Sequence, residues 1–374
     1  AWDEYMPTDD HGNNVSPRHR VLLLLNYAGG GTPTDSERET AEAALQSLER
    51  AYARGSDGLL FTVGYSPSYF ERFEAGVPES VDLQQPKALA PFEDPELDTQ
   101  DAVVHLASNH AQVVLGAEEA LEGAVGELNG VDQPDAALTD VFDIDDRRTG
   151  FTGDGLPAEH ADVDGVPSDA VSEDAPMFMG FKSGFERNQA DENRVTIDSG
   201  PFAGGTTQHV SKLRLNLDQW YEQDDRWQRE AKMFCPHHAE TGAVEGPGDN
   251  LGDDSGIDDC RPAEEAAREM GVVGHTQKTA RARDGDDDPL ILRRDFDSTD
   301  GGRAGLHFLA LQRDISDFVR TRQAMNADDI SSETAVGRRT NNGIRQYLSV
   351  THRGNYLLPP RGRRALPTPE GEDA

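Results

Sequence analysis

Apolar residues in the N-terminal half of the chain recur with two periods, one typical of strands and the other of helices. Short apolar or alternating runs predict strands at 20–28, 58–65 and 101–109. A helical period predicts one helix that begins after the capping-box pair Thr34 and Glu37, and a second helix at 110–128. The order strand, helix, strand, strand, helix is that of a ferredoxin-like α+β sandwich.

The C-terminal half shows the same mixture of elements. Strands are predicted at the start of 204–221, at 290–296 and at 304–314, and helices at 222–234 and 315–325. Between the halves, residues 141–176 are rich in Asp, Gly and Pro and show little periodicity, which is typical of a linker or covering loop. We therefore predict two ferredoxin-like domains, at 17–140 and 177–365, packed either sheet to sheet or edge to edge.

Charge and the length of the apolar runs argue against two classes of partner, nucleic acids and membranes. Acidic residues number 70 against 35 basic ones, which gives a formal net charge of −35, and the excess runs along nearly the whole chain. Such an acidic excess is typical of proteins from salt-loving organisms, where net charge keeps a protein soluble. We expect no nucleic-acid partner because phosphates would be repelled. We expect no membrane span because no run of about 18 apolar residues occurs.

The chain begins with Ala1 and contains two cysteines, Cys235 and Cys260, 25 positions apart. A disulfide between them is one hypothesis, and two reduced, half-buried thiols are the other. A disulfide and a removed leader would favour an exported protein, with a cytoplasmic location as the alternative. His237 and His238 follow Cys235 closely, but this spacing matches no zinc signature, so a separate metal site is not favoured.

The segment richest in candidate chemistry is ILRRDFDSTDGGRAGLHFLALQRDISDFV at 291–319, preceded by GHTQKT at 274–279. Two apolar residues, an arginine pair, a Gly-Leu strand ending in Gln-Arg-Asp and a helix follow one another. In order and spacing this tract resembles the C-terminal half of the dye-decolourising (DyP-type) haem peroxidases, which are built from two ferredoxin-like domains. The resemblance extends over about 20–360 and is strongest at 275–320, and the acidic composition suggests a divergent, haloarchaeal-like member.

The resemblance implies a haem b cofactor and three residues that contact it. GHTQKT is similar to the family segment that carries the proximal histidine, so His275 is the expected iron ligand, with Lys278 beside the cofactor. The alternative for His275 is an exposed loop histidine. Arg293 matches the family's distal arginine, whose permanent charge stabilises the negative charge that develops as the O–O bond of peroxide breaks. The alternative is an arginine on a strand edge, as Arg294 would be.

One departure from the family pattern affects proton transfer. The family carries a Gly-x-x-Asp-Gly motif whose aspartate moves a proton between the two oxygens of peroxide. In GFKSG, at 180–184, Ser183 occupies that position. A serine hydroxyl can orient peroxide but is too weak an acid to act as a carboxylate base. We therefore expect Ser183 to position the oxidant, and we consider Asp154 a conceivable substitute base.

A second departure affects the partner of the proximal histidine. The family places an acidic residue near the C terminus that hydrogen-bonds the imidazole. The matching region, 338–362, offers Asn341 and Asn342 but no carboxylate, which leaves Asp314 and Asp317 as alternatives. A neutral partner would leave the iron less electron-rich and would slow the cleavage of peroxide.

Two functions follow from these residues. The first is a haem-dependent peroxidase that uses hydrogen peroxide to oxidise an organic or dye-like donor, with electrons passing through surface aromatics such as Trp220, Trp227 or Tyr347. The second is a catalytically impaired haem-binding or structural extracellular protein of the same fold. His275 and Arg293 favour the first function, and the two departures favour the second. The identity of the reducing substrate and the formation of a homo-oligomer stay open.

Overall fold

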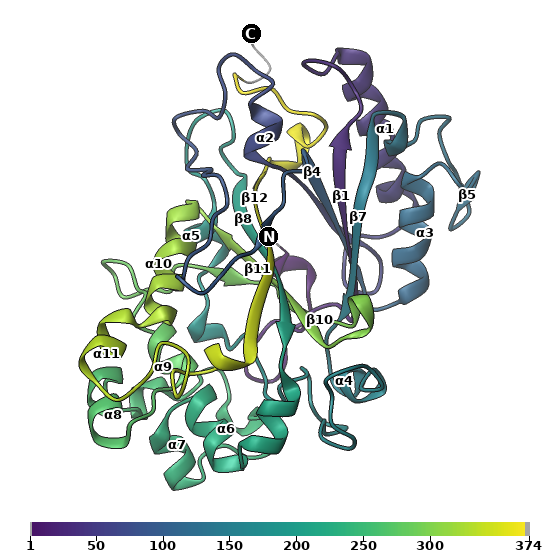
Figure 1. The fold of residues 1–374 in the computed structure, drawn as a ribbon. Helices are drawn as coiled ribbons and strands as arrows, with labels where there is room; N and C mark the ends of the chain where they lie inside the picture. The colour runs from purple at the N-terminus through teal and green to yellow at the C-terminus, as the bar shows by residue number, and fades with distance from the viewer. Residues whose placement is uncertain (1, 371–374) are drawn as a thin grey trace.

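The computed structural model describes residues 2–370, within which ten strands form one sheet that closes on itself (Figure 1). The strands are β1 (His19–Tyr27), β2 (Leu60–Tyr65), β3 (Glu96–Leu97), β4 (Ala102–Ser108), β7 (Phe142–Phe151), β8 (Thr206–Leu215), β9 (Leu292–Arg293), β10 (Phe296–Ser298), β11 (Gly305–Gln312) and β12 (Leu348–Leu358). Their order is β10-β7-β1-β4-β2-β12-β8-β11-β9, and β10 also pairs with β11, which closes the barrel. All pairs are antiparallel except β3 with β12. A separate hairpin joins β5 (Glu127–Leu128) and β6 (Val131–Asp132).

Each half of the chain contributes strands in the ferredoxin-like order. The N-terminal group is β7-β1-β4-β2, and the C-terminal group is β12-β8-β11 followed by β9 and β10. Pairing of β2 with β12 and of β7 with β10 joins the two groups at both edges. The predicted α+β fold of two ferredoxin-like units is confirmed, and of the two predicted arrangements the edge-to-edge one is observed.

The N-terminal strands are covered by α1 (Asp35–Ala51) and α3 (Ala111–Leu121), seen together beside β1 and β7 in Figure 1. The predicted capping box is confirmed, because the Glu37 backbone N–H donates to the Thr34 hydroxyl and the Thr34 N–H donates to the Glu37 carboxylate. Helix α3 is shorter than predicted. It ends where Gly123 adopts a φ of +71°, a left-handed conformation that interrupts the helix.

Strand β1 is apolar on both faces because both faces are covered. Val21, Leu23 and Leu25 pack in a core cluster that includes residues of α1 and α3, whereas Leu22 and Leu24 pack in a second cluster with residues of β8, β11 and β12. Alternate side chains of a strand point to opposite faces. The continuous apolar run of β1 therefore marks a strand between the barrel interior and a helical layer.

Helix α10 (Ile315–Asn326) covers the C-terminal strands. Several short helices gather below these strands in the view of Figure 1. The short helices are α6 (Arg226–Met233), α7 (Pro236–Thr241), α8 (Ala263–Met270), α9 (His275–Thr279) and α11 (Asp328–Glu333). The remaining ones are α2 (Pro67–Phe70), α4 (Leu156–Glu159) and α5 (Glu192–Val195). The helix predicted at 222–234 begins late, because Asp225 caps α6 and a π-helical turn precedes it.

Two long strands, β7 and β12, were not predicted. β7 pairs with β1, so the first part of the predicted 141–176 linker is instead a strand of the N-terminal group. β12 pairs along its whole length with β8 and lies in the region 338–362, for which no strand was expected. The strand predicted at 290–296 is interrupted, since β9 and β10 are separate short strands on the same edge of β11.

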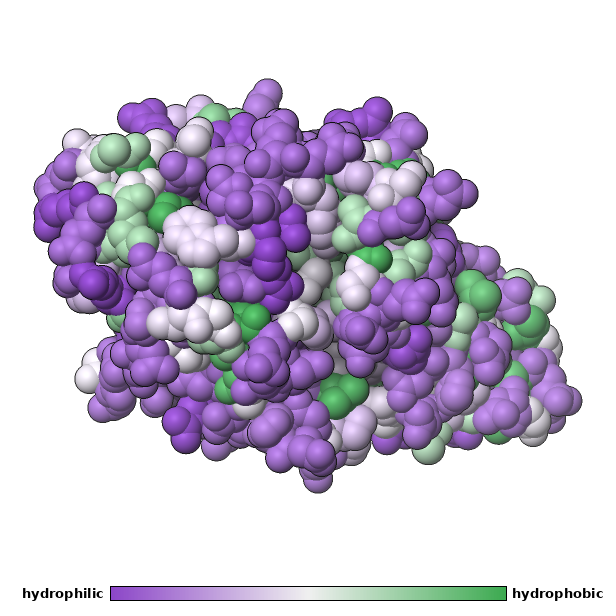
Figure 2. Space-filling model, turned by 90° about the horizontal axis from the view of Figure 1, so that it is seen from below, coloured by the Kyte–Doolittle hydropathy of each residue, from purple (hydrophilic) through white to green (hydrophobic). Residues whose placement is uncertain are grey.

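Hydrophilic residues cover most of the face seen in Figure 2, and apolar residues form small, separate areas on it. Among the described residues, no helix is both long enough and apolar enough to cross a bilayer.

Candidate functional site

A cavity of about 270 Å³ lies between the C-terminal strands and the short helices. Its walls come from the loop at 177–188 and from β8, α9, β9, β11, α10 and β12. Large apolar side chains form much of the lining, among them Met179, Phe181, Phe185, Leu215, Phe234 and Phe308. The volume is close to the lower end of the range of small-molecule pockets, roughly 300–1,000 Å³.

His275 lines this cavity as the first residue of α9. The helix begins after its N-cap Gly274, whose backbone N–H donates to the Gln277 side chain at 3.0 Å. Gly274 lies against the backbone of Phe234, whose oxygen would be 1.6 Å from an added Cβ. Burial, followed by the charges of Lys278 and Arg293, lowers the pKa of His275 to about 3. The imidazole is therefore neutral at ordinary pH, which is the form that binds a metal.

Arg293 and Ser183 come together on the cavity wall. The Arg293 guanidinium donates to the Ser183 hydroxyl at 3.1 Å, and the Arg293 backbone N–H donates to Gln189 at 2.8 Å. Arg293 ends β9, which pairs with β11 through Ala310, so a strand fixes its backbone. Three of the four predicted site residues, His275, Arg293 and Ser183, thus share one cavity.

Lys278, the fourth, does not line the cavity within the described part of the chain. Its ammonium donates to the backbone oxygens of Met325 and Asn342 and to the Asn342 side chain, at 2.6–2.9 Å. These three bonds use every ammonium hydrogen. In this structure the Lys278 side chain joins α9 to the end of α10 and to the segment before β12, and its contact with a cofactor stays a prediction from the resemblance.

The structure adds carboxylates that the motif comparison did not identify. Asp295 and Asp297 both line the cavity, two and four residues after Arg293. Asp297 is fully buried, accepts a hydrogen bond from the Phe178 backbone N–H at 2.6 Å, and has a pKa raised well above its usual value by burial. Asp154, the substitute base considered from the sequence, is not among the residues that line the cavity.

Arginines are concentrated in the cavity although the chain as a whole is acidic. Six arginines line it, namely Arg283, Arg293, Arg322, Arg339, Arg345 and Arg353. Burial lowers the pKa of both Arg345 and Arg353 to about 10, so both remain charged at neutral pH. Buried N–H groups of Arg339, Arg345 and Arg353 have no hydrogen-bond partner among the described residues. Such groups favour an anionic ligand, since charge-assisted hydrogen bonds to carboxylates or phosphates would satisfy them.

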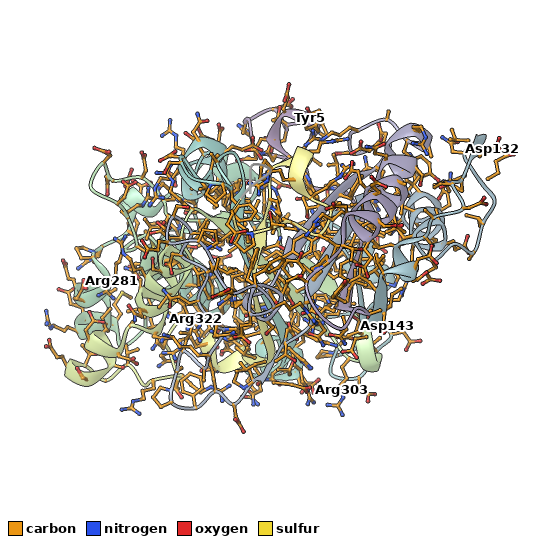
Figure 3. All side chains as sticks on the ribbon, turned by 90° about the horizontal axis from the view of Figure 1, so that it is seen from above. Tyr5, Asp132, Asp143, Arg281, Arg303 and Arg322 are labelled. Carbon is orange, nitrogen blue, oxygen red and sulfur yellow. A yellow bond between two sulfur atoms is a disulfide. The ribbon has the colours of Figure 1, made fainter. Side chains whose placement is uncertain are left out.

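Glu93 partly balances these charges. Its side chain is 3% exposed and accepts hydrogen bonds from Arg353 at 2.9 Å and from Arg322. Figure 3 shows Arg322 within the body of the molecule and Arg281 at its edge. Burial would raise the pKa of Glu93, but the charges of Arg322 and Arg353 outweigh burial and lower it. Glu93 is thus an ionised carboxylate that holds two guanidiniums at the cavity.

The Nδ1 atom of the His275 imidazole is buried and has no hydrogen-bond partner among the described residues. Gly343 packs against its backbone, so the region 338–362 does lie beside His275 as the resemblance implies. Asn342 is engaged by Lys278, and Asp317 is paired with Arg194. None of the described bonds of Asn342 or Asp317 therefore reaches the imidazole.

The predicted surface aromatics differ in their exposure. Trp220 and Tyr347 are fully buried, with ring centroids 4.8 Å apart, whereas Trp227 is 40% exposed. The Tyr347 hydroxyl donates to Asp224 and accepts from Lys232 at 2.6 Å. The expectation that Trp220 and Tyr347 lie at the surface is wrong, and Trp227 alone of the three is accessible.

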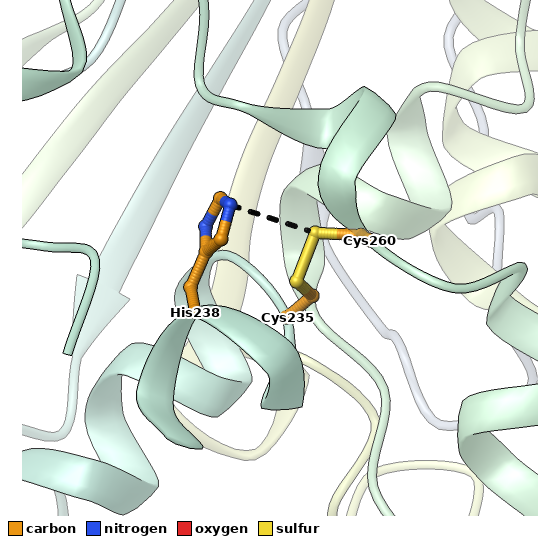
Figure 4. Close-up of side chains that lie close together, drawn as sticks. All are labelled: Cys235, His238 and Cys260. Carbon is orange, nitrogen blue, oxygen red and sulfur yellow. Dashed lines mark hydrogen bonds between the residues drawn. A yellow bond between two sulfur atoms is a disulfide. The ribbon is translucent and has the colours of Figure 1, made fainter. Parts of the chain in front are cut away.

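Cys235 and Cys260 form a disulfide, which decides between the two hypotheses from the sequence (Figure 4). His238 lies beside it, with Nε2 3.9 Å from the Cys260 sulfur. The disulfide joins two segments that hold α9: the Thr276 hydroxyl donates to the Met233 oxygen at 3.0 Å, and the Gln277 side chain donates to the Arg261 oxygen. Sulfur atoms in a disulfide are not thiolate ligands, so this cluster does not bind a metal in the oxidised form.

Loss of the disulfide is expected to destabilise the protein. The Cys235→Ser/Cys260→Ser variant should lose about 3 kcal/mol of unfolding free energy, because the cross-link restricts the unfolded chain across a separation of 25 residues. Denaturant unfolding at high salt measures the difference. A reductant should lower the stability of the wild type and leave the variant unchanged. Equal stability of the variant and the oxidised wild type would contradict this assignment.

Comparison with solved structures agrees with this architecture. The dye-decolorizing protein from V. cholerae is 14% identical, with a TM-score of 0.59 over 96% of this chain and 97% of that chain. A variant of DypB from Rhodococcus jostii RHA1 in complex with heme is 15% identical, with a TM-score of 0.61 over 93% and 95% of the two chains. Identity this low shows a common fold alone.

Sequence comparisons give the family. Among curated proteins, no sequence matches the chain. One family model matches residues 17–360, nearly the whole chain, and is described as a family of unknown function (DUF7405). The closed antiparallel sheet and the two ferredoxin-like groups agree with the fold of the DyP-type structures. The chain therefore belongs to the DUF7405 family and has the DyP-type ferredoxin-like α+β fold.

Proposed function

We propose that the protein is a haem-dependent peroxidase that uses hydrogen peroxide to oxidise an organic or dye-like donor. One observation carries the proposal: a neutral His275 lines the same cavity as Arg293 and Ser183, which are hydrogen-bonded to each other. The likeness in fold to a structure described as a complex with heme supports it. The reducing substrate is not identified by these residues.

The cavity fits haem b in three respects. His275 offers a neutral imidazole for the iron. The apolar lining suits a flat, largely apolar macrocycle. The unsatisfied N–H groups of Arg339, Arg345 and Arg353 suit the two carboxylates at the edge of that macrocycle. These residues would hold the group, and bound haem would supply the redox chemistry that reduces peroxide and oxidises the donor.

Arg293 and Ser183 would hold the peroxide. The guanidinium would donate hydrogen bonds and place its charge next to the oxygen that becomes negative as the O–O bond breaks. Ser183 would orient the same molecule through its hydroxyl, which already accepts from Arg293. Apolar side chains such as Phe181 and Phe308 would limit water around these groups and strengthen their electrostatic effect.

A catalytically impaired haem-binding protein is the second candidate, and a specific observation favours it. Nδ1 of His275 has no hydrogen-bond partner among the described residues, so no carboxylate there makes the imidazole more basic. Ser183 also cannot serve as a proton acceptor in the way a carboxylate can. Under this second candidate function, the protein would bind haem in the same cavity but would reduce peroxide slowly.

The proposal extends to environment and partners. The charge of −35 is consistent with a haloarchaeal-like origin and a high-salt medium, and the disulfide favours export. Of the three aromatic residues considered, only the exposed Trp227 could meet a bulky donor directly. A homo-oligomer is compatible with the proposal and is tested by the mass of the protein in solution.

The decisive experiment combines haem binding with turnover. The purified protein is titrated with haem at high salt, and its Soret band is recorded before hydrogen peroxide and a dye are added. A saturable Soret band and dye oxidation at a rate far above free haem would support the peroxidase. A Soret band without turnover would support the impaired haem protein, and no saturable band would exclude both.

Replacing Arg293 is expected to slow the reaction without removing haem. Arg293→Leu should lower the rate of peroxide reduction about 100-fold, which is the typical loss when one charged or hydrogen-bonding group is removed from a developing oxyanion. Arg293→Lys should retain part of the rate because it keeps the charge. Stopped-flow absorbance measures the rate, and the surface variant Arg187→Leu, whose side chain is 67% exposed, is the control. An unchanged rate in Arg293→Leu would exclude Arg293 from the reaction.

A further inference from the structure

The carboxylates that line the cavity differ in whether they have an oxygen free to contact a ligand. Four line it: Glu93, Asp94, Asp295 and Asp297. Glu93 is engaged by two arginines, and Asp94 is exposed at the protein surface. The Asp297 carboxylate accepts a backbone hydrogen bond, and burial raises its pKa well above the usual value. Of these four described residues, Asp295 alone combines burial with a free oxygen.

Asp295 has the geometry of a group that acts on a ligand of Arg293. Its side chain is 10% exposed, and its Oδ2 lies 4.0 Å from a guanidinium nitrogen of Arg293, too far for a hydrogen bond. Its Oδ1 is buried and has no partner among the described residues. A buried carboxylate oxygen without a partner is costly, so a ligand that donates a hydrogen bond there would be favoured.

We propose that Asp295 is the residue that transfers a proton between the two oxygens of the peroxide held by Arg293 and Ser183. The inference rests on the proposed function, because it assumes that peroxide is bound next to haem in this cavity. A base must lie within hydrogen-bond reach of the proton that it accepts, directly or through one water. Asp295 lines the same cavity with an oxygen 4.0 Å from the Arg293 guanidinium, which places it to reach a peroxide held by Arg293 directly or through one water, whereas the Ser183 hydroxyl is not a base at neutral pH.

The proton returns to peroxide within the same cycle. Asp295 would take the proton from one oxygen of hydrogen peroxide and give it to the other oxygen as the O–O bond breaks, so that the second oxygen leaves as water. Over the whole reaction, two electrons and two protons from the reducing substrate would complete the reduction of hydrogen peroxide to two waters, with bound haem supplying the redox chemistry. Peroxide is reduced, the donor is oxidised, and the carboxylate ends in its initial form.

Arginine guanidiniums are the main charged neighbours of Asp295. Arg293 lies closest, and Asp295 interacts electrostatically with the buried guanidiniums of Arg20 and Arg294. Asp297, whose pKa is raised by burial, also interacts electrostatically with Asp295.

The test removes the carboxylate at position 295 and then supplies one at position 183. Asp295→Asn keeps the size of the side chain but removes the base, and it should lower the rate of peroxide reduction at least 100-fold with an unchanged Soret band. Adding Ser183→Asp to this variant should restore at least a tenth of the wild-type rate. Asp295→Glu, which retains a carboxylate, should also exceed Asp295→Asn. The exposed loop variant Asp286→Asn is the control and should match the wild type.

A second measurement does not depend on turnover. Hydrogen cyanide must lose a proton when it binds haem iron, so its association rate reports a base in the cavity. Asp295→Asn should slow cyanide association at least tenfold, and Ser183→Asp should reverse the effect. Full haem loading with wild-type rates of both reactions in Asp295→Asn would overturn the inference and leave the proposed function intact. Equal losses in the Asn and Glu variants would also overturn it. If the wild type binds no haem, the proposed function itself fails.

Discussion

The His275→Ala variant is expected to lose haem binding while it keeps the fold of the wild type. The imidazole is the one neutral histidine side chain that lines the cavity in the described part of the chain, and alanine offers no ligand for iron. Changes to the hydrogen-bond partners of metal ligands already lower affinity about 10- to 100-fold. Removal of the ligand itself should therefore lower haem affinity by at least about 100-fold.

Haem titration followed at the Soret band, with circular dichroism of the same samples, measures both parts of this prediction. His110→Ala is the matched control, because His110 is exposed and makes no side-chain cap bond to α3. Added imidazole should restore part of the spectrum in His275→Ala by entering the space that the side chain leaves. Wild-type affinity in His275→Ala would assign the iron to another ligand and remove the basis of the proposed function.

The long strands that the sequence predicted are buried over most of their length. β1 is apolar along its whole length because helices lie on one side of it and the barrel interior on the other. β7 was missed because it has exposed or half-exposed polar residues at most positions, among them Asp143, Asp145 and Arg147. β12 was missed for a similar reason, since its first five residues are only partly buried. Periodicity thus detects burial, and strands that have many solvent-exposed side chains escape it.

The candidate site was predictable where its residues lie in contiguous motifs. His275 and Arg293 belong to segments that resemble the DyP-type pattern, and Ser183 stands at the aspartate position of the family motif at 180–184. Asp295 lies in the same motif, two residues after Arg293, but only the three-dimensional arrangement shows that its carboxylate oxygen is buried and free. The bonds of Lys278 to Asn342 were not predictable, because a motif does not reveal to which side of a short helix a side chain points.

The arginines of the cavity were not predictable from the sequence. Arg339, Arg345 and Arg353 lie between 339 and 353, Arg322 lies on α10, and Glu93 comes from a loop more than 200 residues earlier. No local pattern connects these positions. In a chain with twice as many acidic as basic residues, a group of arginines around one buried carboxylate is a feature of the tertiary structure, and it is the feature that favours an anionic cofactor.

Glu93→Gln is expected to lower the unfolding free energy of the haem-free protein by about 3–5 kcal/mol. This is the typical loss when one partner of a buried ion pair is removed and the other charge stays buried. Here two guanidiniums, those of Arg322 and Arg353, lose their carboxylate. Asp94→Asn, a change at the exposed neighbouring residue, should have an effect below about 0.5 kcal/mol. Urea unfolding at neutral pH and high salt measures both values.

Acid should reproduce part of this loss in the wild type. The folded-state pKa of Glu93 is lowered, so its contribution to stability is present above the ordinary glutamate pKa and is lost as the pH falls through the folded-state value. The difference between wild type and Glu93→Gln should therefore shrink below about pH 4. Bound haem should also reduce this difference in stability at neutral pH, because the haem carboxylates would pair with the guanidiniums that Glu93→Gln leaves unbalanced. A difference that is the same with and without haem would place the haem carboxylates elsewhere and leave the arginines around Glu93 with a structural role.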